Sequence, residues 1–233
     1  MDFNGGTIII GSLLWDITPK RVKWRRLCLK DIATKIPVKV KIRYGRQSQT
    51  RSNTYSMIFS NHPTTSFGQG AILGFKEVIK SFRGLEKQAF ALASAEGLWG
   101  GNPSLNKTWG TVGLLLNPNI DTKNKVGADI IRTKWAALYQ NYNDTFDPTN
   151  YRIDNENSVI DKNGFLQLEW TEEMNVFDFL IATPVVPTKV LLTAKQVADK
   201  MIEKNYTEYF DNNTANSITT FQDNDIKHLL RRQ

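Results

Sequence analysis

The sequence of 233 residues predicts a mixed α+β fold. Residues 38–44 alternate strictly between apolar and basic side chains, which is typical of a strand with one buried face. Residues 76–96 instead repeat their apolar side chains at helical spacing. Because the predicted strands and helices do not follow the regular β-α-β rhythm of a doubly wound sheet, the pattern favours the α+β class.

The first half of the chain contains most of the predicted strands. A buried strand at 7–15 runs into a loop, and the strand at 38–44 should expose its basic side chains, Lys39, Lys41 and Arg43. Further strands are predicted at 54–60, 71–75 and 110–116, and the last of these should stop at Asn117-Pro118.

The second half of the chain predicts a helix at 128–142 and strands at 165–170 and 176–181. Thr193 and Gln196 form a Thr-x-x-Gln capping box, so a helix should begin after Thr193. A short terminal helix follows, with Ile226, Leu229 and Leu230 on one face.

The two halves are joined at 117–125 by a Pro-bearing turn rather than a linker. We therefore expect residues 1–120 to form a mixed α+β core and residues 121–233 to form a C-terminal α/β extension packed on the same unit.

Composition indicates an ordinary globular protein, with 40% hydrophobic and 23% charged residues. No apolar run reaches the eighteen or so residues of a membrane span, and the longest one, at 7–15, lacks the features of a signal peptide. We therefore expect a cytoplasmic protein without membrane association. The single cysteine, Cys28, excludes an intrachain disulfide and a multi-cysteine metal site.

Positive charge is concentrated near the beginning of the chain. Residues 1–51 contain twelve Lys or Arg residues and three Asp residues, a net charge of +9, whereas the whole chain carries +7. Such a segment suits either a solvated face or contact with an anionic ligand or nucleic acid.

Several common chemistries are absent from the sequence. Neither a Walker phosphate loop nor a G-x-G-x-x-G motif occurs, and the two histidines stand in no H-E-x-x-H motif. Two features remain as candidates for chemistry. The first is Gly11-Ser12-Leu13-Leu14, where a strand ends in a loop whose successive amide groups can bind an anion.

The second candidate is Glu96, which continues the apolar helical face of Leu85, Ala89 and Leu92 and precedes Gly97, a residue typical of a helix C-cap. Burial and the negative end of the helix dipole both disfavour an ionised carboxylate at this position. A general acid or base that works near neutral pH needs such an environment.

Taken together, these features resemble the gamma-glutamylcyclotransferase-like family. The resemblance covers roughly residues 7–116 and rests on Gly11-Ser12-Leu13, the glycine-flanked strand Gly70–Gly74 and Glu96-Gly97, 84 residues after Ser12. The sequence differs from the family pattern in having Ile10 in place of an aromatic residue and in the long segment after Pro118.

The resemblance implies a small mixed β-barrel with flanking helices. It also implies that Gly11, Ser12, Leu13 and Leu14 bind a small γ-glutamyl substrate, without any metal or cofactor. Glu96 would act as general base and acid while the α-amine attacks the γ-carbonyl, closing 5-oxoproline and expelling the attached amine. This is an intramolecular cyclisation of the acyltransferase or lyase type.

Two alternatives from other functional classes stay open. A non-catalytic protein of the same fold would bind a small molecule or a partner in the same pocket. A nucleic-acid-binding protein would use the basic segment 20–51, in which Trp24 among the cations of 20–26 would stack on bases. The sequence predicts no particular oligomeric state.

Overall fold

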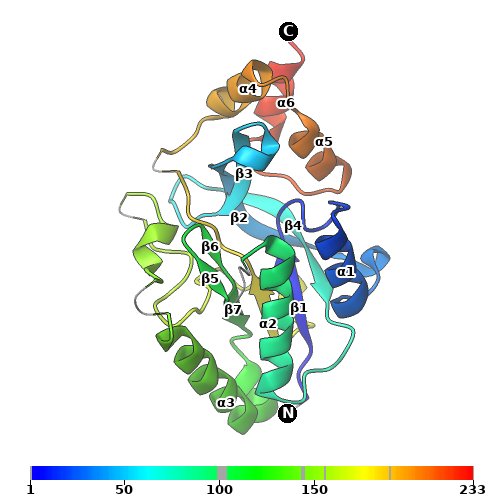
Figure 1. Cartoon of the computed structure of the whole chain (residues 1–233), viewed down its shortest axis with the longest axis vertical. Coiled ribbons are helices and arrows are strands. Elements are labelled where there is room, and N and C mark those ends of the chain that lie inside the picture. Colours follow the sequence, from blue (N-terminus) through cyan, green and yellow to red (C-terminus); the bar gives the residue numbers. More distant parts are fainter. Residues whose placement is uncertain (1, 99–103, 143–144, 155, 189, 233) are drawn as a thin grey trace.

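The computed structural model describes residues 2–98, 104–142, 145–154, 156–188 and 190–232. Over these residues, six α-helices surround a six-stranded mixed sheet that curls into a half-barrel (Figure 1). The predicted α+β class is therefore confirmed. None of the helices in the described ranges is both long and apolar enough to cross a membrane.

The sheet combines strands from both halves of the chain. Its strand order is β3 (Thr54–Phe59), β2 (Ile36–Ser48), β4 (Phe67–Gly74), β1 (Gly5–Ile9), β8 (Phe179–Ala182) and β7 (Gly113–Leu116). Neighbouring strands are antiparallel except β1 and β8, which are parallel, with Thr7 opposite Ile181. A two-stranded ribbon of β5 (Asn106–Lys107) and β6 (Gly110–Thr111) precedes β7. Because β8 lies between β1 and β7, the sheet is incomplete without residues from the second half.

The helices lie around this sheet. In order they are α1 (Pro19–Cys28), α2 (Phe82–Glu96), α3 (Ile120–Gln140), α4 (Ala194–Glu203), α5 (Glu208–Ala215) and α6 (Asp223–Leu230). Helices α1 and α2 pack against each other, and α4 contacts both α6 and β3. Figure 1 shows the last three helices gathered at the β3 end of the molecule, whereas α3 lies at the other end.

Local sequence explains where α2 begins and ends. The Ser81 hydroxyl accepts a hydrogen bond from the amide of Gly84 at 3.3 Å, as an N-cap residue does. At the other end Gly97 adopts φ +81°, a left-handed conformation that favours glycine, so the helix ends at Glu96 as predicted. The capping box of Thr193 and Gln196 at the start of α4 is also confirmed.

Some predicted elements are wrong in position or type. Residues 165–170 form only isolated bridges, Leu114 with Phe165 and Ile160 with Leu166, because they contact β7 and a loop instead of running along a neighbouring strand. The helix predicted at 76–96 begins at Phe82, since Ile79 is held in a bridge to Phe3.

The prediction that Arg43 faces solvent is also wrong, because its side chain is 1% exposed. Its Nε donates to the Ser60 hydroxyl at 3.0 Å, and that hydroxyl donates to a Glu156 carboxylate oxygen at 3.2 Å. Burial lowers the pKa of Arg43, and the nearby Glu156 acts in the opposite direction. A residue from the second half of the chain thus covers β2 at Arg43, whereas Lys39 on the same face is exposed as predicted.

Candidate functional site

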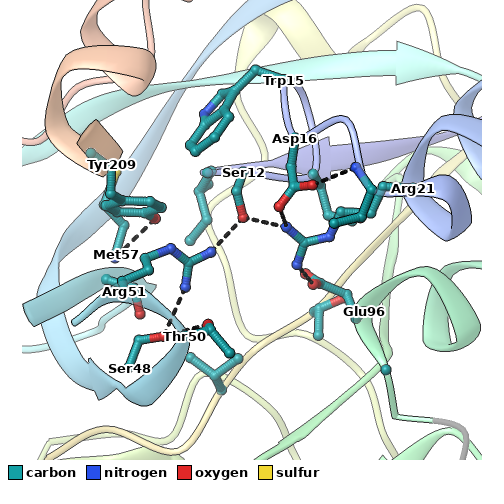
Figure 2. Close-up of a pocket in the computed structure, with 18 of the residues that line it drawn as sticks. Ser12, Trp15, Asp16, Arg21, Ser48, Thr50, Arg51, Met57, Glu96 and Tyr209 are labelled. Carbon is teal, nitrogen blue, oxygen red and sulfur yellow. Dashed lines mark hydrogen bonds and ion pairs between the residues drawn. The ribbon is translucent and has the colours of Figure 1, made fainter. Parts of the chain in front are cut away.

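A cavity of about 1480 Å³ lies beside the end of β1. Its walls come from the loop at 10–18, the β2–β3 connection at 46–51, the end of α2 at 95–97 and the segment around α5. Figure 2 shows side chains from these elements converging on it.

The sequence-predicted residues come together here with one exception. Gly11, Ser12 and Leu13 line the same cavity as Glu96, although 84 residues separate Ser12 from Glu96. Leu14 does not line it, because its side chain is 1% exposed and packs in the hydrophobic core.

Arg21 joins the two predicted features. Its Nη1 donates to the Ser12 hydroxyl at 2.7 Å and to Asp16 Oδ2 at 2.6 Å, and its Nη2 donates to Glu96 Oε2 at 3.0 Å (Figure 2). The Arg21 side chain is only 15% exposed, so these interactions are partly shielded from water. Although burial opposes the effect, the Thr18 amide and the Arg21 guanidinium lower the pKa of Asp16.

Sequence reasoning missed the role of Arg21 because it missed helix α1. A local signal for that helix exists: Thr18 precedes Pro19 at the first helical positions, where proline is favoured.

The surroundings of the Glu96 carboxylate are more polar than the sequence predicts. Its side chain is 18% exposed and forms an ion pair with Arg21, rather than lying unpaired on an apolar face. Only Oε2 is held in this way. Oε1 accepts no hydrogen bond from any residue that the structure describes, so one oxygen is anchored while the other is available to a ligand.

The loop after β1 has unused donors. Within the described parts of the chain, the amide groups of Gly11, Ser12 and Leu13 donate no hydrogen bond, whereas the next amides close the turn by donating to Gly11 and Ser12 carbonyls. Three successive free amides are suited to binding an anionic group. Glycine is favoured at position 11, because a Cβ there would lie 2.5 Å from the hydroxyl oxygen of Tyr209 and would force that side chain to shift.

Two further arginines line the cavity. Arg51 donates to the hydroxyls of Ser12 and Ser48, and its guanidinium lies 4.3 Å from the ring centre of Tyr209 (Figure 2). The guanidinium of Arg46 lies 4.4 Å from the ring centre of Trp109. The residues that line the cavity therefore include three carboxylates, Asp16, Glu96 and Glu208, together with three guanidinium groups and the ammonium group of Lys20.

Part of the basic segment 20–51 contacts the interior of the protein, whereas its exposed cations include Lys20, Lys23, Arg26, Lys30 and Lys39. Trp24, which would have to stack on bases in the nucleic-acid alternative, is only 4% exposed. Arg25 donates to the carbonyls of Leu13 and Asp16 at 2.6 and 2.7 Å, and so holds the loop that carries Ser12. The contacts of Trp24 and Arg25 therefore favour a structural role beside the cavity for these two side chains.

No group of three or more metal-ligating side chains occurs in the described ranges. Among the side chains that line the cavity, the guanidiniums, carboxylates and hydroxyls suit the binding of a polar ligand and proton transfer. In comparisons with known proteins, no family model, curated protein or solved structure matches this chain.

Proposed function

We propose that the protein is a γ-glutamyl cyclotransferase-like enzyme, with Glu96 as its general base and acid. The observation that carries the proposal is that Glu96 and the Gly11-Ser12-Leu13 loop line one cavity and are joined through Arg21. A frayed helix end with Glu96 turned to bulk water would have been incompatible with this activity.

The free amides of the loop are suited to the α-carboxylate of a γ-glutamyl group. Three successive donors can bind both oxygens of a carboxylate, and Leu13 provides apolar surface in the same wall of the cavity. Arg21 contacts both Ser12 in this loop and Oε2 of Glu96, so the proposal requires the α-amine of the bound group to face Oε1.

In the proposed reaction, the α-amine nitrogen attacks the γ-carbonyl carbon of the same group. A C–N bond forms and closes 5-oxoproline, and the C–N bond to the attached amine breaks. Glu96 accepts the proton lost by the attacking nitrogen and returns it to the departing amine. An α-amine with a pKa of about 8 needs only a modest base, and confinement of both reacting groups in one molecule contributes much of the acceleration.

The test is the substitution Glu96→Gln, which preserves the shape of the side chain and removes the base. We expect kcat for a γ-glutamyl dipeptide such as γ-glutamyl-alanine to fall about a hundredfold to ten-thousandfold, with little change in Kd measured by calorimetry. Glu86→Gln, in the same helix but outside the cavity, is the matched control and should keep wild-type kinetics.

A wild-type protein that binds γ-glutamyl compounds without converting them would contradict the enzymatic proposal. That result would instead support a non-catalytic binding protein with the same pocket. Equal kinetics for wild type and Glu96→Gln would also refute the role of Glu96.

A further inference from the structure

Neither Arg46 nor Arg51 forms an ion pair with a carboxylate in the described ranges. The two acceptors of Arg51 are the neutral hydroxyls of Ser12 and Ser48. The side chain of Arg46 donates to no residue in the described ranges, although it lines the cavity. By contrast, Arg21 in the same cavity has two carboxylate partners, Asp16 and Glu96.

Aromatic rings hold both guanidiniums in place. Arg46 lies over Trp109 and Arg51 over Tyr209, at 4.4 and 4.3 Å from the ring centres. Cation–π stacking occupies the flat face of a guanidinium and leaves its five N–H groups free to donate. Arg51 uses two of them on Ser48 and Ser12, so three remain for a ligand. The planar edge of a guanidinium matches the oxygens of a carboxylate or phosphate, to which it can donate two parallel hydrogen bonds.

The two positive charges are also close enough to repel each other. Burial and then the neighbouring charge of Arg51 lower the pKa of Arg46, while Glu96 acts in the opposite direction. A bound oxyanion would neutralise this partly buried pair of like charges.

The cavity has room for such a group in addition to a γ-glutamyl moiety. Its volume of about 1480 Å³ exceeds the roughly 300–1,000 Å³ of a common small-molecule pocket. Arg51 lies on the side of Ser12 away from Glu96 in Figure 2, so its N–H groups address a different part of a ligand from the reacting one.

We propose that Arg46 and Arg51 form an oxyanion subsite, which binds a phosphate or carboxylate group carried by the ligand. This inference extends the proposed function by specifying an anionic group on the ligand outside the reacting γ-glutamyl moiety. It does not require Glu96 to be catalytic, because binding of an oxyanion can be measured without turnover.

The test is calorimetric titration of the full chain with inorganic phosphate and, separately, with succinate at low ionic strength. We expect Arg46→Gln and Arg51→Gln to bind the preferred anion about tenfold more weakly or worse, since each removes charge-assisted hydrogen bonds. Arg83→Gln, an exposed position on α2 outside the cavity, is the control and should bind as the wild type does. The preferred probe distinguishes a phosphate-bearing ligand from a carboxylate-bearing one.

Glu96→Gln separates this proposal from the enzymatic one. It should bind the anion at least as tightly as the wild type, because it removes a negative charge near Arg46. The proposed subsite would be refuted if Arg46→Gln bound the anion with wild-type affinity, or if Arg83→Gln lost as much anion affinity as Arg46→Gln. If Arg51→Gln does not fold after losing its two serine contacts, Arg46→Gln and Arg46→Lys decide the question. Arg46→Lys should bind the anion more weakly than the wild type, because lysine lacks the planar guanidinium that donates two parallel hydrogen bonds.

Discussion

Asp223, at the start of α6, should contribute less to the stability of the fold at neutral pH than in mild acid. Its side chain is 7% exposed, and burial raises the pKa of this carboxyl from 3.8 to about 6. Thr220 donates a hydrogen bond to Oδ1, but Oδ2 has no partner in the described part of the chain. The folded protein therefore favours the protonated carboxyl.

The size of the effect follows from the pKa difference. A rise of about 2 units corresponds to about 3 kcal/mol, because each unit is worth about 1.4 kcal/mol. Since the folded-state pKa is the higher one, this stabilising contribution is fully present below about pH 4 and is lost as the pH rises through about 6. Asp223→Asn removes the titration, so the variant should be up to about 3 kcal/mol more stable than the wild type at pH 7.

Urea unfolding of both proteins at several values between pH 4 and pH 7.5 provides the measurement. The stability difference should grow with pH and nearly vanish at pH 4. Asp225→Asn changes an exposed carboxyl on the same helix and should show no such growth. A difference between Asp223→Asn and wild type that is independent of pH would refute the reasoning.

Three other substitutions test the site and the fold. Gly11→Ala should destabilise the protein by about 1–3 kcal/mol and weaken ligand binding, because its Cβ would lie 2.5 Å from the Tyr209 hydroxyl. In denaturant unfolding, the double variant Gly11→Ala/Tyr209→Phe should recover part of this loss of stability. Arg21→Gln should lower kcat for a γ-glutamyl dipeptide more than it changes KM in steady-state kinetics, because Arg21 positions Glu96 and Ser12. A kcat equal to that of the wild type would contradict this positioning role. Thr193→Ala should cost about 1 kcal/mol in urea unfolding through loss of the capping box on α4, and an unchanged midpoint would contradict the cap's contribution.

The sequence predicted those parts of the site that depend on local pattern. The position of Glu96 followed from the helical repeat of Leu85, Ala89 and Leu92 and from the glycine that ends α2. Both signals lie within this one helix and its C-cap. The glycine–serine loop was found because a strand ends there.

The remainder of the site depends on contacts between distant segments. Arg51 reaches Ser12 across 39 residues, and Tyr209 contacts the backbone of Met57 across 152. The alternation at 38–44 also misplaced Arg43, because Glu156, more than a hundred residues later in the chain, lies beside it and its side chain is buried. Periodicity identifies the faces of an element but not which distant segment will cover them.

The measurement that tests the central proposal most directly is the product balance of the wild-type protein with a γ-glutamyl dipeptide, followed by mass spectrometry. The account predicts equal amounts of 5-oxoproline and released amino acid, because the substrate's own α-amine displaces the leaving amine. Release of glutamate in place of 5-oxoproline would contradict it, since water would then be the attacking group, and so would binding of the dipeptide without any product.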